Sequence, residues 1–272
     1  MKKLLSMLLL VLLTATAING CGSSEIYRTL SDIEKSGYIN IGVYNNKEPF
    51  GYLNENDELT GYDIELANRV AEDLGVTANL IPVNINERLT TLEDGKCDIV
   101  IANFTVTPER AERVDFALPY MKTSLGLLCR QDNVITSLSE IAENEPIIAL
   151  KGTAGETYLK NNYPNLKIMS YGSREDGTNA FYEYTAVAFV NDNTDVIMMA
   201  SENPEFVVGI PAFGDVDTIA PAVTKGNETL LSWLNDEIRT LRNEKFFHQA
   251  YSDTLASTFG EDNADSLVID AE

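Results

Sequence analysis

Short apolar runs alternate with helical patterns along this chain, and this alternation limits its possible folds more than any other feature. In the first half, strand-like runs at 39–44, 79–83 and 97–104 are separated by helical patterns at 61–75 and 88–95. Strands that alternate with helices predict a mostly parallel sheet with helices on both faces. We therefore expect an α/β fold, with ligand-binding residues near the carboxyl ends of the strands.

The first helical pattern carries signals for where it begins and ends. Apolar residues recur at helical spacing through the stretch GYDIELANRVAEDLG. Thr60 and Asp63 are predicted to cap its start, and Gly75 is predicted to end it. The stretch therefore predicts one amphipathic helix.

The same alternation begins again in the second half of the chain. Strand-like runs are expected at 146–152, 166–172 and 186–192, with helices between and after them. An apolar stripe predicts a single amphipathic helix from 228 to about 255, and the acidic stretch beyond it is expected to be loosely held. Two similar halves predict two α/β lobes with a cleft between them.

The N-terminus has the pattern of an export signal. The residues MKK precede an apolar run, LLSMLLLVLLTATA, which has the length of a secretory signal and is short for a membrane span. The next residues, INGC, resemble a bacterial lipobox, although Asn19 is unusual at its position. We predict a signal peptide over 1–20, lipidation of Cys21 and a tether over 21–36. The alternative is an ordinary signal peptide that is cut nearby.

The charge balance argues against nucleic acid as a partner. The chain has 42 acidic and 20 basic side chains, which give a formal net charge of −22. Binding to a nucleic-acid backbone requires a basic face, and this composition does not supply one.

Two further cysteines, Cys97 and Cys129, lie in apolar strand-like runs. An oxidising compartment would permit a disulfide between them. Buried cysteines commonly act as small apolar residues, so we favour two free thiols.

An arginine stands where the helix dipole disfavours it, in the stretch ANFTVTPERAERVDFALPY. Thr107 is a favoured helix cap and Pro108 suits the first helical position, so Arg110 falls in the first turn. The partly positive start of a helix repels a cation unless an anion lies between them. Arg110 and the hydroxyl of Thr105 are therefore a candidate carboxylate pocket. The local pattern leaves open a surface ion pair of Arg110 with a nearby acid, namely Glu109, Glu112 or Asp115.

Two long motifs resemble the hallmarks of family 3 of the bacterial solute-binding proteins. They are GYDIELANRVAEDL at 61–74 and LEDGKCDIVIANFTVTPERAERVDFALPYM at 92–121. Further matches follow in the expected order, so the resemblance covers about residues 37–260. It implies capture of a polar amino acid for an ABC importer, at a periplasmic or cell-surface location. The subgroups that bind acidic amino acids or cysteine are the most similar.

The resemblance also implies an architecture and a set of partners. The fold is expected to be periplasmic-binding-protein-like (type II), with two α/β lobes joined by two crossover strands. Lobe 1 is expected over 37–125 and 222–272, and lobe 2 over 126–221. The implied protein is a monomer without cofactor or metal. It would deliver its ligand to a permease and its ATPase, and its lipid anchor would hold it at the membrane.

Five site residues follow from this resemblance. Arg110 would hold the α-carboxylate of the ligand with help from Thr105, and Asn103 would offer its backbone carbonyl to the α-ammonium. Asp192 would be the counter-charge of the ammonium, although a helix cap is the alternative for this residue. Thr153 would reach the carboxylate or side chain of the ligand, and its alternative is also a cap.

The residues that would select the ligand side chain give mixed signals. Arg88 corresponds to an arginine that often meets the distal polar group of the ligand. Tyr44 stands where binders of acidic amino acids often carry a base, which favours a neutral ligand such as cysteine or glutamine. Lys47 would add a charge, or it is an exposed loop lysine. The segment NAFYEYTAVAF resembles the glutamate type, so cysteine, glutamate, aspartate and glutamine all stay open.

Two other functional classes stay open. Some relatives of this fold are dehydratases of cyclic acids, for which Glu87 or Glu202 would be the candidate general acid. The only histidine is His248, and the sequence has no zinc-binding spacing and no nucleotide-binding motif. A sensor or adhesin built on the same fold is the other alternative, and a neighbouring permease gene would argue for transport.

Overall fold

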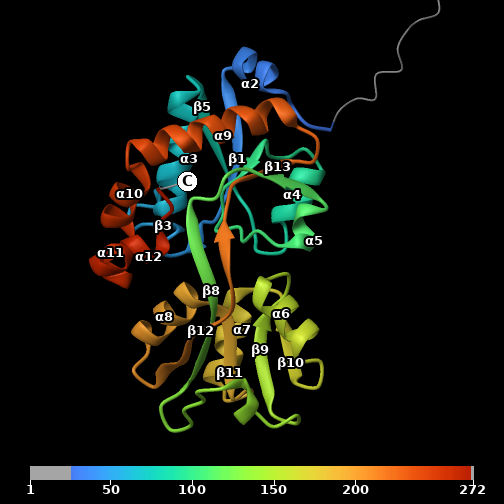
Figure 1. Ribbon diagram of the computed structural model, residues 1–272, viewed down its shortest axis with the longest axis vertical. Coiled ribbons are helices and arrows are strands. Elements are labelled where there is room, and N and C mark those ends of the chain that lie inside the picture. The colour runs from blue at the N-terminus through green and yellow to red at the C-terminus, as the bar shows by residue number, and fades with distance from the viewer. Residues whose placement is uncertain (1–25, 271–272) are drawn as a thin grey trace, which may run out of the picture.

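Two five-stranded sheets organise residues 26–270, the part of the chain that the computed structural model describes. Each sheet forms the centre of one lobe, and the lobes lie end to end along the long axis of the molecule (Figure 1). We call them lobe 1 and lobe 2 in the order of their sheets. The predicted two-lobed α/β fold is confirmed.

Lobe 1 contains a sheet with the strand order β5-β1-β6-β13-β7 and a small three-stranded sheet, β2-β3-β4. The strands are β1 (Tyr38–Val43), β2 (Asn46–Lys47), β3 (Gly51–Leu53), β4 (Leu59–Thr60), β5 (Thr77–Pro82), β6 (Ile99–Val100), β7 (Val114–Phe116) and β13 (Ala222–Thr224). The helices are α2 (Leu30–Ser36), α3 (Tyr62–Asp73), α4 (Arg88–Glu93), α5 (Pro108–Ala111), α9 (Glu228–Asn243), α10 (Phe246–Thr254), α11 (Ala256–Phe259), η2 (Glu261–Asn263) and α12 (Ala264–Leu267).

Lobe 2 contains a sheet with the strand order β10-β9-β11-β8-β12. The strands are β8 (Met121–Arg130), β9 (Pro146–Leu150), β10 (Lys167–Tyr171), β11 (Ala188–Asp192) and β12 (Phe206–Ile219). The helices are η1 (Leu138–Glu140), α6 (Ala154–Asn162), α7 (Arg174–Tyr182) and α8 (Asn193–Glu202). Strands β8 and β12 run side by side between the lobes and pair along their length, so they are the two crossover strands (Figure 1).

Each large sheet is mostly parallel, as the sequence predicts. In lobe 1, β13 is antiparallel to both of its neighbours, while β1 is parallel to β5 and β6. In lobe 2, β8 is antiparallel to both of its neighbours, while β9 is parallel to β10 and β11. The two antiparallel strands are both at a crossing between the lobes: β8 is a crossover strand, and β13 directly follows the crossover strand β12.

Apolar side chains fill both faces of these sheets. In lobe 2, Leu127 and Ile147 belong to one buried cluster, and their neighbours Leu128 and Ile148 belong to another. Successive residues of a strand point to opposite faces, so each strand serves both clusters.

The two cysteines of the folded part are buried and free. Cys97 lies in lobe 1 and Cys129 lies in lobe 2. Burial raises the pKa of the Cys97 thiol to about 12, which makes its reactive thiolate scarce at neutral pH. The prediction of two free thiols is confirmed.

Four predictions about helices and segments need correction. Helix α3 has Gly61 at its N-cap without a side-chain cap, because Asp63 is turned inward. The predicted tether is too long, since its residues 30–36 form α2 and bury Ile33 in the core. The long C-terminal helix is broken at Lys245, whose φ of 59° is left-handed.

Up to residue 270, where the described chain ends, the acidic C-terminal stretch is not loosely held. Val268 is buried and forms a bridge with Met121 at the start of β8. The amide of Ile269 donates to the carbonyl of Tyr120 at 3.2 Å. The stretch is therefore fixed beside the crossover strand.

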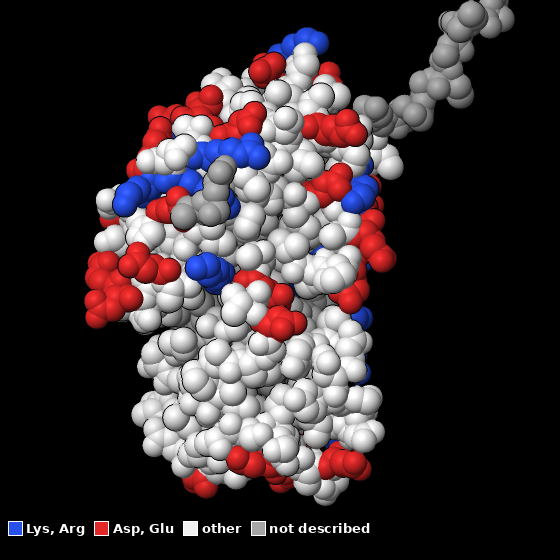
Figure 2. Space-filling view, viewed as in Figure 1, with Lys and Arg blue, Asp and Glu red and all other residues white. Residues whose placement is uncertain are grey.

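The surface of the two lobes differs on the face seen in Figure 2. Acidic and basic side chains lie together over lobe 1, whereas the face of lobe 2 is mostly uncharged, with acids near its far end (Figure 2). Among residues 26–270, no helix has the length and apolar character needed to cross a bilayer.

Candidate ligand-binding cleft

Arg110 is buried between the lobes. Thr107 caps α5 by accepting from the amide of Arg110 at 3.3 Å, so the arginine occupies the predicted first turn. Its Nη1 donates to the carbonyl of Thr105 at 2.5 Å, and its Nη2 donates to the carbonyl of Gly152 in lobe 2 at 2.7 Å. The alternative of a surface ion pair is wrong, because the side chain points inward and is only 6% exposed.

The guanidinium of Arg110 lies in a setting that favours an added anion. Burial lowers the pKa of Arg110 to about 9, and the positive charge of Arg88 acts in the same direction. Its contacts in the described chain are two neutral carbonyls and the ring of Phe104, 5.0 Å away. A carboxylate at this position would offset the cost of the buried charge.

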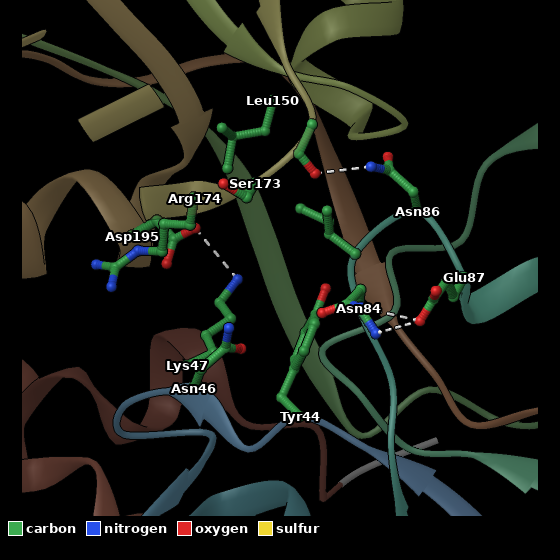
Figure 3. A pocket seen from close by; sticks show the side chains of 12 residues that line it. Tyr44, Asn46, Lys47, Asn84, Asn86, Glu87, Leu150, Ser173, Arg174 and Asp195 are labelled. Carbon is green, nitrogen blue, oxygen red and sulfur yellow. Dashed lines mark hydrogen bonds and ion pairs between the residues drawn. The ribbon is translucent and has the colours of Figure 1, made fainter. Parts of the chain in front are cut away.

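Lys47 joins the two lobes. It lies on β2, and its Nζ is 3.2 Å from Oδ2 of Asp195 in lobe 2 (Figure 3). The same Nζ is 3.9 Å from Oδ2 of Asp192, also in lobe 2. The same ammonium donates to Oδ1 of Asn103 at 3.3 Å. Burial disfavours the charged form, but the two carboxylates outweigh it and raise the pKa of Lys47. The alternative of an exposed loop lysine is wrong.

Asp192 ends β11 and stands directly before α8, yet its side chain makes no cap hydrogen bond. The cap alternative for Asp192 is therefore wrong. Burial raises the pKa of its carboxyl, and nearby Lys47 partly offsets this effect.

Asp195 is a cleft residue that the sequence analysis missed. It lies in the first turn of α8 and is 2% exposed. Asn191 and Lys47 contact its Oδ2, while its Oδ1 has no hydrogen-bond partner in the described chain. Its spacing of three residues from Asp192 places both on one face of a helix start, and this spacing was the available signal.

Thr153 and Thr105 lie at the cleft and already make hydrogen bonds there, Thr153 through its hydroxyl and Thr105 through its carbonyl. The hydroxyl of Thr153 donates to the carbonyl of Leu150 at 2.7 Å and accepts from the amide of Glu156 at 3.2 Å. The cap alternative for Thr153 is therefore confirmed. Thr105 is buried beside Arg110, and its carbonyl receives the guanidinium.

Asn103 turns the chain out of the sheet. Its φ of 43° is left-handed. The strand predicted over 97–104 is too long, because β6 covers only Ile99–Val100 and the chain leaves the sheet before Asn103. Its carbonyl accepts from Nη1 of Arg88 at 2.9 Å. This is the oxygen predicted to meet the ligand ammonium, and a carbonyl can accept a second hydrogen bond.

Asp63 supports the turn at Asn103 and was also missed as a site residue. Its Oδ2 accepts from the amide of Asn103 at 2.6 Å, and its Oδ1 accepts from the hydroxyl of Tyr120 at 2.6 Å. Burial raises the pKa of Asp63 to about 6, although both hydrogen bonds oppose the rise.

Arg88 and Tyr44 form the wall opposite lobe 2. Arg88 donates to backbone carbonyls and lies over the rings of Tyr44, at 5.5 Å, and Phe104, at 4.6 Å. The hydroxyl of Tyr44 is buried and has no partner among the described residues.

Most of the predicted site residues line one small cavity between the lobes. They are Tyr44, Lys47, Arg88, Thr105, Arg110, Thr153 and Asp192. Asn103 is not in its wall and reaches the site through Lys47 and Arg88. The cavity thus places a guanidinium of lobe 1 and a carboxylate of lobe 2 in one wall.

Comparison with known proteins gives the family. The sequence profile of the bacterial extracellular solute-binding proteins, family 3, matches residues 39–254. The chain belongs to this family. Its two lobes, crossover strands and shared cleft are therefore those of a family 3 solute-binding protein.

Solved and curated relatives cover most of this family 3 protein. The cysteine-binding protein from Campylobacter jejuni is 39% identical with a TM-score of 0.85, and the match covers 89% of this chain and 99% of that one. A solute receptor for L-cysteine of Neisseria gonorrhoeae is 35% identical with a TM-score of 0.86, over 89% and 100% of the two chains. The ABC transporter glutamine-binding protein GlnH of Bacillus subtilis is 25% identical over 264 residues, 92% of this chain and 96% of its own.

The candidate acids of the enzyme alternative lie outside the small cavity. Glu87 is exposed and accepts from Asn84 at 3.0 Å, and Glu202 is exposed at the end of α8. His248 contacts Asp265 and Asp270 in the C-terminal part of lobe 1.

Proposed function

We propose that this protein captures a small polar L-amino acid between its lobes and delivers it to an ABC import permease. The observation that carries the proposal is the pair of opposite charges in one cavity, Arg110 from lobe 1 and Asp192 from lobe 2. An amino acid carries a carboxylate and an ammonium on one carbon, so this pair is its chemical complement. Both side chains are buried, and the low local dielectric strengthens such contacts.

The ligand would exchange existing contacts for its own. Its carboxylate would take the Nη2 of Arg110 from the carbonyl of Gly152, while Nη1 keeps the carbonyl of Thr105. Its ammonium would lie at Asp192 and use the second lone pair of the Asn103 carbonyl. The helix start at Thr153 would face the carboxylate, since free amides at such a start attract anions.

A neutral side chain, with L-cysteine as the first candidate, fits the remaining charges best. Lys47 already pairs with Asp195, and Arg88 already donates to backbone carbonyls. A second ligand carboxylate would have to compete with these partners. The two solved relatives named for cysteine support the same choice, and glutamine is the next candidate.

Closure is the proposed signal to the permease. The ligand stabilises the closed lobes only through contacts that it makes to both of them. We also propose that the protein binds its ligand without converting it, because the relatives named above are binding proteins. Export, lipid anchoring at Cys21 and a monomeric state belong to the proposal as well; residues 1–25 lie outside the described chain.

The test is calorimetric titration of the mature protein with L-cysteine and L-glutamine. We expect Arg110→Ala to lower affinity about a hundredfold or more, since it leaves a ligand carboxylate buried without its cation. Arg113→Ala is the matched control, because Arg113 pairs with Glu93 on the surface of the same segment. A folded Arg110→Ala protein with unchanged affinity would overturn the proposed carboxylate site.

A further inference from the structure

Asp63 is a buried acid of the first hallmark motif, and it does not line the small cavity. It lies in the first turn of α3, and none of its surface is exposed. Its Oδ2 accepts from the amide of Asn103 and its Oδ1 accepts from the hydroxyl of Tyr120, each at 2.6 Å. Both carboxylate oxygens are thus engaged, which fixes the orientation of the side chain.

The turn at Asn103 has a conformation that the backbone does not favour by itself. Its φ of 43° is in the left-handed region, which is costly for a residue other than glycine and persists where the surroundings stabilise it. Three charged side chains contact this residue: Asp63 at its amide, Arg88 at its carbonyl at 2.9 Å, and Lys47 at its Oδ1 at 3.3 Å. The direction of the Asn103 carbonyl therefore depends on contacts from distant parts of the chain.

These three contacts differ in where they come from. Lys47 and Arg88 line the small cavity, whereas Asp63 contacts the turn from inside lobe 1, beside Tyr120 of the buried apolar cluster. Lys47 has the same charge as a ligand ammonium and lies near the same carboxylates, so an entering ligand would compete with it. The contact from Asp63 can stay unchanged while the ligand enters.

Stability alone does not explain a carboxylate at this place. Burial disfavours its charged form and raises the pKa of Asp63 to about 6. A neutral acceptor could bond the amide of Asn103 without this cost. An ionised carboxylate gives a stronger hydrogen bond, and so fixes the turn more firmly. Backbone strain held at a cost in stability is typical of functional sites.

We infer that Asp63 is a positioning residue for the ligand ammonium. It fixes the turn at Asn103 so that the carbonyl of Asn103 is directed at an ammonium bound by Asp192, and it does not touch the ligand itself. This inference rests on the proposed function, because it requires an amino acid held between Arg110 and Asp192. It gives the first hallmark motif a role in the binding site.

The experiment compares L-cysteine with 3-mercaptopropionate, the same molecule without its ammonium, by calorimetry on the intact mature protein. Asp63→Ala should lower the affinity for L-cysteine about tenfold, because the carbonyl of Asn103 is no longer fixed toward the ammonium. The affinity for 3-mercaptopropionate should stay within about twofold. L-glutamine and glutaramate are the equivalent pair if the wild type prefers glutamine.

Two further variants separate positioning from a merely structural role. Asp63→Asn keeps an acceptor for the amide of Asn103 but loses the charge, so its affinity for L-cysteine should fall only about threefold. Glu65→Ala is the matched control and should bind as the wild type does, since Glu65 is exposed in the same turn of α3. Thermal unfolding reports whether each variant folds.

The outcomes separate this inference from the proposed function. Equal losses for the two ligands, or wild-type affinity for L-cysteine in a folded Asp63→Ala protein, would overturn the inference and leave the amino-acid site standing. If Asp63→Ala does not fold, Asp63→Asn decides, and unchanged affinity for L-cysteine overturns the inference. If the wild type binds neither L-cysteine nor L-glutamine, the proposed function itself fails and the inference fails with it.

Discussion

The two lobes contribute opposite charges to the space between them. Around the small cavity, lobe 1 supplies the basic side chains, which are Lys47, Arg88 and Arg110, and lobe 2 supplies the acidic Asp192, with Asp195 beside Lys47. Their outer surfaces do not show this division, because lobe 1 carries acids and bases together in Figure 2. Charge separation is thus a property of the cleft, which net charge and composition do not reveal.

The two sets of charges also differ in what satisfies them. Arg88 of lobe 1 has carbonyls and aromatic rings of its own lobe as partners. Arg110 has the Thr105 carbonyl and the Phe104 ring of its own lobe and the Gly152 carbonyl of lobe 2, all of them neutral groups. The carboxylates of lobe 2 receive their cation, Lys47, from the opposite lobe. Closing the cleft without a cation there would bury two like charges, which is costly. A ligand ammonium or Lys47 must therefore accompany closure.

The largest effect expected from this comparison follows removal of Lys47. Lys47→Met should disfavour the closed form of the ligand-free protein by about 3 kcal/mol or more, because the carboxylates of lobe 2 would be buried without their cation. Small-angle X-ray scattering should give a larger radius of gyration for the variant than for the wild type without ligand.

The matched control for Lys47→Met is the double variant Lys47→Met/Asp195→Asn, which should recover part of the compact state. Equal radii of gyration for the wild type and a folded Lys47→Met protein would contradict the claim that the carboxylates of lobe 2 need Lys47 of lobe 1 for closure.

A second prediction concerns Asp63, a buried acid of lobe 1 that has neutral partners. The pKa of Asp63 is raised from 3.8 to about 6, so folding favours its protonated form. Its contribution to stability is full below about pH 4 and is lost as pH rises through 6. Relative to Asp63→Asn, the wild type should lose roughly 2 kcal/mol of unfolding free energy between pH 4 and pH 7.

Urea unfolding of both proteins across this pH range measures the difference. A stability difference that does not change with pH would show that Asp63 titrates normally. It would contradict the contrast between Asp63, which has neutral partners, and the acids of lobe 2, which have Lys47 as their cation.

The smallest effect is expected for a lysine pair within lobe 2. Lys160 contacts Glu156 at 2.6 Å and is 56% exposed in its side chain, while Glu156 keeps hydrogen bonds from Gly152 and Ser170. Lys160→Met should change the unfolding free energy by less than about 1 kcal/mol and leave the radius of gyration unchanged. A change in radius as large as that of Lys47→Met would mean that loss of any lysine opens the protein.

Local signals in the sequence were enough to place Arg110 and the two lobes. Thr107 and Pro108 define the first turn of α5 without help from distant residues, and alternating patterns define the sheets. The roles of Asp63 and Asp195 could not be read in this way, because their partners Asn103, Tyr120 and Lys47 are distant in the chain. Asp63 does not cap α3 as predicted, because its carboxylate accepts hydrogen bonds from Asn103 and Tyr120 instead.

The most direct test of the account uses ligands that have one charged end instead of two. L-cysteine has both ends, cysteamine lacks the carboxylate, and 3-mercaptopropionate lacks the ammonium. Calorimetry should show that, of the three ligands, only L-cysteine binds the wild type tightly. The variant Asp192→Asn should lower the affinity for L-cysteine far more than the affinity for 3-mercaptopropionate. Equal losses for both ligands, or wild-type binding of either single-ended molecule as tight as that of L-cysteine, would contradict a zwitterion held between the lobes.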